Sequence, residues 1–130
     1  MTERRKFDLV KKLGEFEIRK YHPCVMADVA VNSGYQNAGN IGFRPLATYI
    51  SQNQIAMTAP VVLEEKSADS WVVSFVMPAE KKLADLPIPK NSKVSLRQAP
   101  EHYAAALSFS GHTSSNKVVE KEKALRNLLA

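Results

Sequence analysis

An internal repeat constrains the fold of this chain more than any other feature of its sequence. Residues 16–34 begin with Phe-Glu-Ile-Arg and end in Ser-Gly, and residues 94–111 begin with Val-Ser-Leu-Arg and end in Ser-Gly. A helical pattern follows each copy. After its helix the first copy continues into two predicted strands, whereas the second stops on its helix. The complete unit is therefore strand-strand-helix-strand-strand, and we expect the second unit to be truncated.

Hydrophobic periodicity supplies the individual elements. A period of two predicts strands, and a longer period predicts two amphipathic helices. Gly39, Gly42 and Pro45 weaken the first half of the first helix, so we expect it to start near Phe43 or to bend there. The predicted strands are 6–13, 16–18, 24–31, 55–63, 71–77, 94–98 and 103–109, with a charged turn at 64–70, and the predicted helices are 35–51 and 114–130.

Composition is that of one globular domain spanning residues 1–130, with 45% hydrophobic and 24% charged residues. The single cysteine, Cys24, cannot form an internal disulfide, which favours a cytoplasmic location. The net charge is +5, but lysines alternate with glutamates at 80–82 and 117–123, which is typical of a solvated face rather than a nucleic-acid surface. No apolar run approaches the roughly 18 residues of a membrane span, so we expect neither a membrane nor a nucleic acid as a partner.

Six motifs occur in an order that makes the chain resemble the SOUL/heme-binding protein family. The resemblance runs from about residue 7 to residue 130, and its most specific block is Met-Thr-Ala-Pro at 57–60. The motifs are FEIRKY at 16–21 with Pro23, GFR at 42–44 with Leu46 and Tyr49-Ile50, IAMTAPV at 55–61, FVMP at 75–78, LPIP at 86–89 and FSG at 109–111.

This resemblance implies an α+β fold, in which a duplicated unit forms a distorted antiparallel β-barrel with two flanking helices. Members of the family continue past the second helix into a further strand segment, to which nothing in this chain corresponds. Without that segment, barrel edges would be unpaired, and unpaired edges recruit other strands. We therefore expect either a homodimer through the open barrel edge or a marginally stable monomer.

The resemblance also implies reversible binding of heme or another tetrapyrrole, with the first helix against the porphyrin. Two positions that match basic residues of the family are Asn40 and Thr48 here, so Arg44, Arg19 and Lys20 remain to pair with a propionate. Arg44 is the candidate propionate partner. The candidate wall residues are Ile41, Phe43, Leu46, Ala47 and Ile50. An equally open alternative is that these side chains simply pack on the sheet.

Iron ligands are harder to assign, because Lys20 stands where a histidine is the proposed ligand of the SOUL protein. His22 would point to the same strand face and could substitute as a metal ligand, although a surface histidine is the alternative interpretation. The expected roles of the other candidates are structural: the methionines Met26, Met57 and Met77 fill the core, Cys24 is a small buried hydrophobe, and His102 and His112 lie in turns or caps.

No sequence motif of a nucleophile elbow, phosphate loop or zinc protease is present, so we predict that the protein is not an enzyme. The leading hypothesis is non-catalytic binding of heme, or of another small apolar anionic ligand, in an apolar groove. The alternative is a module for other small hydrophobic ligands that acts through protein partners, similar to the effector-binding domains of bacterial transcription regulators. A purely structural role that uses the open edge is a third possibility.

Overall fold

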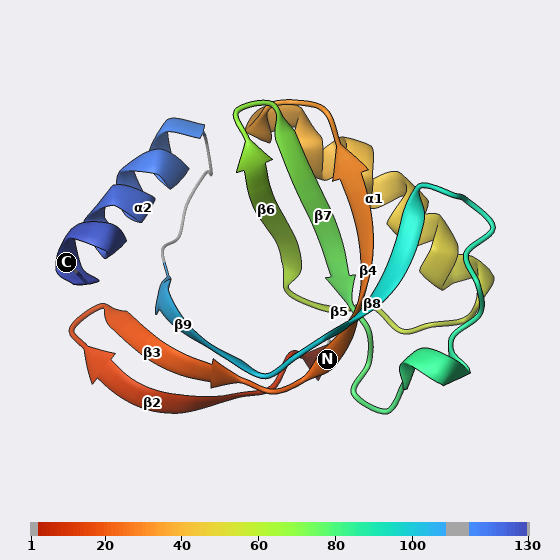
Figure 1. Cartoon of the computed structure of the whole chain (residues 1–130), viewed down its shortest axis with the longest axis horizontal. Coiled ribbons are helices and arrows are strands. Elements are labelled where there is room, and N and C mark those ends of the chain that lie inside the picture. The colour runs from red at the N-terminus through yellow and green to blue at the C-terminus, as the bar shows by residue number, and fades with distance from the viewer. Residues whose placement is uncertain (1–2, 109–114, 130) are drawn as a thin grey trace. The chain divides into compact units, whose positions relative to one another are not determined.

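The computed structural model describes residues 3–108 and 115–129, and its chain divides into two compact units (Figure 1). The first unit contains Met1–Arg5 and Pro23–Pro100, and the second contains Lys6–His22 and Glu101–Ala130. Strands in mostly antiparallel sheets and two α-helices make the fold α+β, as expected. No helix in the described ranges has the length and hydropathy needed to cross a bilayer.

A four-stranded antiparallel sheet forms the frame of the first unit, in the order β6-β7-β4-β8. The central strands β4 and β7 are rich in β-branched and aromatic residues, which suit a buried pleated surface. A short parallel pair, β1 with β5, accompanies the sheet. The bounds are β1 Glu3–Arg4, β4 Cys24–Val31, β5 Thr58–Ala59, β6 Val61–Ser67, β7 Ser70–Val76, the 3-10 helix η1 Leu83–Asp85, and β8 Val94–Ala99.

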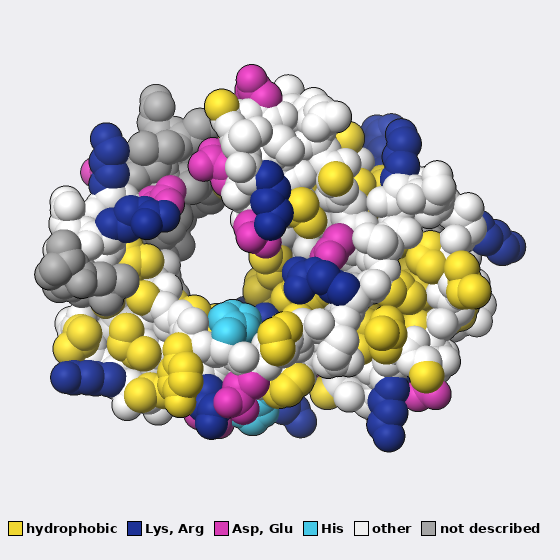
Figure 2. All heavy atoms as spheres, viewed as in Figure 1, with side chains coloured by type: hydrophobic (Ala, Val, Ile, Leu, Met, Phe, Trp, Pro, Cys, Tyr) yellow, Lys and Arg dark blue, Asp and Glu magenta, His cyan; other side chains and the backbone are white. Residues whose placement is uncertain are grey.

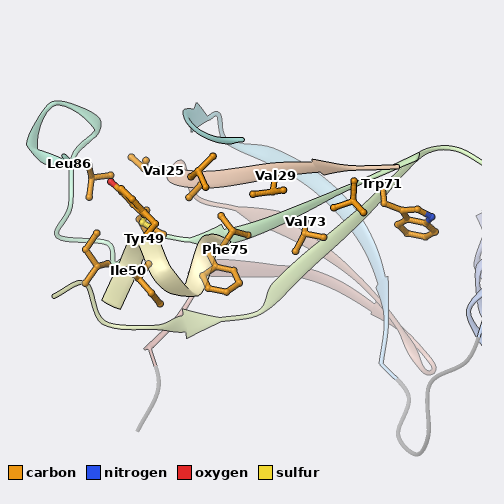
Figure 3. Packing of buried hydrophobic residues seen from close by; sticks show 14 of the residues in the cluster. Val25, Val29, Tyr49, Ile50, Trp71, Val73, Phe75 and Leu86 are labelled. Carbon is orange, nitrogen blue, oxygen red and sulfur yellow. The ribbon is translucent and has the colours of Figure 1, made fainter. Parts of the chain in front are cut away.

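Helix α1, Tyr35–Gln52, covers one face of this sheet and encloses the core (Figure 3). Its buried residues recur at helical spacing, and alternate residues of β4 and β7 meet them. Tyr49 also donates its hydroxyl to the carbonyl of Pro87 at 2.7 Å, which ties the helix to the loop after η1. The buried helix residues are Ala38, Gly42, Leu46, Tyr49 and Ile50, and the buried odd-numbered strand residues include Val25, Val29, Trp71, Val73 and Phe75.

The second unit consists of a three-stranded sheet in the order β2-β3-β9 and of helix α2. The bounds are β2 Phe7–Leu13, β3 Phe16–Tyr21, β9 His102–Leu107 and α2 Ser115–Leu129. Gly14, at a φ of 63°, makes the turn between β2 and β3, because a glycine adopts the left-handed region without strain. Every residue of the three strands is exposed or half-buried. Figure 2 accordingly shows hydrophobic side chains at the surface over β2 and β3.

The strand registers are compatible with the internal repeat that the sequence predicts. In the β3-β9 ladder Phe16 pairs with Leu107, and in the β4-β8 ladder Cys24 pairs with Ala99. The two residue numbers add to 123 in every pair of both ladders (16 and 107, 24 and 99). Because residue 16 of the first copy corresponds to residue 94 of the second, β3 is the counterpart of β8 and β4 is the counterpart of β9.

Several element boundaries differ from the prediction. Helix α1 starts at Tyr35, where the helical period begins, and runs through Pro45. Of the two expectations for its first half, the later start near Phe43 is therefore wrong. The predicted strand 55–63 is divided: a loop comes first, then the short strand β5, and β6 begins after Pro60. Strand β6 extends to Ser67 and so includes most of the segment that was predicted to be a charged turn. None of the three sheets of the described residues pairs its own two edge strands, so a closed barrel stays an expectation.

Candidate functional site

Helix α1 carries all six candidate ligand-binding residues, and the sheet divides them into two groups. Leu46 is fully buried and Ile50 is 7% exposed, so both pack on the sheet as the alternative interpretation held. Ile41 is 52% exposed and Phe43 is 41% exposed. Arg44 is exposed and Ala47 is half-buried. A ligand on the surface of the helix could therefore contact Ile41, Phe43, Arg44 and Ala47.

The two exposed hydrophobic residues lie on different flanks of α1. At 3.6 residues per turn, positions 41 and 43 are separated by about 160° around the helix axis. Phe43 and Ala47 are four residues apart and share one flank. Ile41 shares the other flank with Asn37 and Thr48, which make that flank more polar. One flat ligand on one flank would therefore contact Phe43 and Ala47 but not Ile41.

A buried ring of β7 supports the Phe43 flank from beneath, and a half-buried residue of β6 borders it. The rings of Phe43 and Phe75 meet edge to face, with centroids 5.4 Å apart. Gly39, one turn before Phe43, lies beside Leu63, whose Cδ2 is 3.6 Å from where a methyl group on Gly39 would be. Leu63 is half-buried. Sequence reasoning missed Phe75 and Leu63 as neighbours of the site, because periodicity shows which strand face is apolar but not which helix covers it.

Among the three basic candidates, the structure distinguishes Arg44 from the two strand residues. Arg19 forms an ion pair with Glu17 at 2.7 Å, donates to the Tyr21 hydroxyl at 2.9 Å and lies over the Phe7 ring. Lys20 approaches Glu101 at 3.5 Å. Arg44, in contrast, has no hydrogen-bond or ion-pair partner among the residues that the structure describes. Of the three basic side chains, Arg44 is thus the one whose guanidinium can bind a ligand carboxylate without breaking an existing ion pair.

His22, the candidate metal ligand, directly follows the last residue of β3 and belongs to the second unit. Its backbone N–H donates to the carbonyl of Lys6 at 3.1 Å, and its Nε2 is 3.1 Å from a carboxylate oxygen of Asp8. An iron atom would have to displace Asp8 or use the other ring nitrogen. Across the described ranges, no three His, Cys, Asp or Glu side chains gather where one metal ion could bind them.

The other possible iron ligands occupy structural positions, with one exception. Met26 is 4% exposed and Met77 is 2% exposed, which confirms that both fill the core, although Met77 follows β7 rather than lying in it. Met57 is 39% exposed in the loop before β5, so its predicted place in the core is wrong. His102 begins β9 and stacks on Tyr21, and is therefore not a turn residue. His112 lies outside the described residues.

Two further side chains, Cys24 and Tyr49, could bind iron only when deprotonated, and burial raises the pKa of both. Burial raises the pKa of the Cys24 thiol, and the Arg5 and Arg97 guanidinium groups offset part of that rise. Burial also raises the pKa of the Tyr49 hydroxyl, which already donates to Pro87. Both groups stay protonated near neutral pH, whereas thiolate and phenolate are the forms that bind iron. Cys24 is half-buried, close to its predicted role as a small hydrophobe.

Comparison with known proteins identifies a family for this chain. A search of curated proteins finds no match to the chain. The family model described as SOUL heme-binding protein matches residues 2–130, which is nearly the entire sequence. The chain therefore belongs to the SOUL heme-binding protein family.

Proposed function

We propose that this protein binds heme or another tetrapyrrole reversibly and without catalysis, on the Phe43 flank of α1. The observation that carries the proposal is an exposed aromatic ring on this flank, with an exposed guanidinium on the neighbouring flank: Phe43 is 41% exposed, and no described residue pairs with Arg44, which lies about 100° from Phe43 around the helix axis and one turn from Ala47. An apolar ring surface beside a cation is complementary to a porphyrin, which has an apolar macrocycle and peripheral carboxylates. Membership of a heme-binding family supports the same ligand.

Each residue of the flank would have a separate role. Phe43 and Ala47 would cover one porphyrin face, with Leu63 beside them, and burial of apolar area would provide most of the binding free energy. Arg44 would pair with a propionate. Leu46 and Ile50, which pack on the sheet, would hold the helix in position without contacting the ligand. Because a helix surface is convex, it covers only one face of a flat ligand, which is consistent with reversible binding.

The iron would be weakly coordinated in this arrangement. Helix α1 contains no His, Met or Cys, and the hydroxyl of Tyr49 is bound to Pro87. His22 belongs to the other compact unit and its Nε2 already contacts Asp8, so its role as a metal ligand stays a prediction and is not part of the site on α1. When bound, the heme supplies an iron centre that accepts a fifth or sixth ligand. The residues of this chain provide an apolar surface and a counter-charge, so porphyrins without iron should also bind.

The test is to titrate the protein with hemin and monitor binding through the Soret band. The wild-type chain is compared with two charge-reversal variants, one on each helix. Arg44→Glu should weaken binding by roughly 1–3 kcal/mol, about 5- to 150-fold in Kd, because it removes a charge-assisted contact and adds repulsion. Arg126→Glu is the matched control, since Arg126 is an exposed arginine on α2 whose only described ion pair is with Glu122. A lower melting temperature of Arg44→Glu with unchanged affinity would assign Arg44 to the fold instead.

The same titration distinguishes tetrapyrrole binding from the alternative function, which is a module for other hydrophobic ligands. An effector site for cationic ligands would need an acidic counter-charge, whereas the exposed helix residue beside Phe43 is basic. We therefore expect hemin and iron-free protoporphyrin to bind, and a hydrophobic dye cation of similar size not to bind. Tighter binding of the cation would favour the alternative.

A further inference from the structure

The segment between β7 and β8, residues 79–93, carries the most exposed large hydrophobic side chain of the described residues (Figure 1). Ile88 is 89% exposed, and Leu83, in η1 of the same segment, is 40% exposed. Keeping such side chains in water costs free energy, and grouped exposed apolar residues are typical of binding sites. Neither residue belongs to the tetrapyrrole site on α1, so the function proposed above does not explain their exposure.

The residues next to Ile88 hold it in this exposed position. Leu86 is 8% exposed and packs in the core of the first unit, and the carbonyl of Pro87 accepts the hydroxyl of Tyr49 at 2.7 Å. Pro87 and Pro89, on either side of Ile88, each have a fixed φ angle. Because the chain is anchored and stiffened at this point, Ile88 can enter a partner with little further loss of conformational freedom.

Lysines flank the two exposed hydrophobic residues in the sequence. The segment contains four lysines against Glu80 and Asp85, so its net charge is +2. None of the four forms an ion pair with a described residue. Figure 2 shows hydrophobic and basic side chains together over the part of the molecule where this segment runs. These lysines are Lys81, Lys82, Lys90 and Lys93. The charge of the segment therefore favours an acidic partner.

We propose that residues 79–93 bind the surface of an anionic lipid bilayer, with Ile88 inserted below the headgroups and the lysines beside the lipid phosphates. A bilayer is the partner that these features favour, because it offers apolar depth behind a layer of negative charge without a preformed pocket. The expectation of no membrane partner rested on the lack of a spanning run, which binding at the surface does not require. This interface is separate from the tetrapyrrole site on α1.

Co-sedimentation with lipid vesicles tests the proposal. The full chain should sediment with vesicles of phosphatidylcholine and phosphatidylserine but not with phosphatidylcholine alone, and added salt should weaken binding because it screens the lysines. Ile88→Asp should lower the fraction bound, with a loss of about tenfold or more in affinity, since it removes apolar insertion and adds repulsion. Val10→Asp is the matched control, because Val10 on β2 is also β-branched and 53% exposed, and it should leave vesicle binding unchanged.

A charge reversal tests the contribution of the lysines. Lys90→Glu should weaken binding to the anionic vesicles roughly 5- to 30-fold, because it replaces attraction to the lipid phosphates with repulsion. Lys123→Glu is the control, since Lys123 is an exposed lysine on α2, and it should change the affinity little. A wild-type chain that does not sediment with the anionic vesicles overturns the proposal, and an acidic groove of a protein would then be the partner that the segment fits.

Fluorescence measures insertion directly and does not depend on the stability of the charged variants. In a Cys24→Ser background, an environment-sensitive dye attached to Ile88→Cys should shift its emission to the blue when the anionic vesicles are added, because it enters the apolar layer. The same dye attached to Val10→Cys should not shift. A dye at position 88 that stays in water while the chain sediments with the vesicles would show that another surface binds them, and contradicts the proposal.

Discussion

Gly42 of α1 lies directly against Val73 of β7, so that a methyl group on Gly42 would be 2.5 Å from Cγ2 of Val73. Val73 is fully buried in a central strand and has little room to move. We predict that Gly42→Ala lowers the free energy of unfolding by about 1–3 kcal/mol, since overpacking outweighs the gain in helix propensity. Gly39→Ala is the control: its methyl group would make an ordinary 3.6 Å contact with Leu63, and it should be neutral or stabilising. Urea denaturation measures both, and equal effects would contradict the packing described here.

Asp28 links three strands on the sheet face opposite α1. It accepts hydrogen bonds from the buried hydroxyl of Ser74 on β7 and from the guanidinium of Arg97 on β8. Asp28→Ala should cost about 1–3 kcal/mol of stability, because it leaves the Ser74 hydroxyl buried without this acceptor. Adding Ser74→Ala to Asp28→Ala should recover part of that loss. A double-mutant cycle by denaturant unfolding measures the coupling, and purely additive effects would show that the hydrogen bond contributes nothing.

Cys24 should react slowly with alkylating reagents at pH 8, because burial raises the pKa of its thiol. The raised pKa of Cys24 also makes the stability of the fold depend on pH. The folded chain holds the proton more tightly than the unfolded chain, so this contribution to stability is complete below the unfolded pKa and declines as pH rises above it. The measurement is the rate at which iodoacetamide alkylates Cys24, compared with its rate for the cysteine of a short unstructured peptide. A rate equal to that of the peptide would contradict the described burial.

The Soret spectrum of the hemin complex should be broad and lack the features of a six-coordinate low-spin iron, because α1 provides no His, Met or Cys. His22→Ala should change it little, since Asp8 already approaches Nε2 of His22. The matched control is Asp8→Ala, which removes the competitor. A sharp low-spin spectrum that disappears in His22→Ala would instead make His22 the axial ligand.

The two units should unfold in one transition, as a single domain of 130 residues would. The chain passes between them without a linker, at Arg5-Lys6, His22-Pro23 and Pro100-Glu101, and the same strand register holds on both sides. Calorimetry and circular dichroism should give coincident melting curves. Two separate transitions would mean that the units are independent domains.

Most of the strands and both helices could be predicted from the sequence, since alternation and helical spacing directly reflect burial. The continuity of the first half of α1 could not, because Gly42 and Pro45 disfavour an isolated helix. In the structure Gly42 permits close approach to Val73. Pro45 has no backbone N–H to donate to the carbonyl of Ile41, four residues earlier. Because Ile41 lies on an exposed flank, a water molecule can donate to that carbonyl instead. Tertiary packing thus reverses the local preference.

For the candidate site, the sequence selected a helix but could not separate its faces. Leu46 and Ile50 are as apolar as Ile41 and Phe43, and only the position of the sheet decides which are accessible. The pairing of His22 with Asp8 was equally hidden, because it depends on the register of the β2-β3 hairpin. The availability of Arg44 became visible only when the partners of Arg19 and Lys20 were known.

The measurement that tests the account most directly is hemin affinity in the pair Phe43→Ala and Ile41→Ala, with melting temperatures measured in parallel. Both residues are exposed hydrophobics on α1, on opposite flanks. The account predicts saturable one-to-one binding by the wild-type chain, a loss of affinity of about tenfold or more in Phe43→Ala from lost apolar burial, and little change in Ile41→Ala. Absence of saturable binding, or an equal loss in both variants, would contradict a tetrapyrrole site on the Phe43 flank.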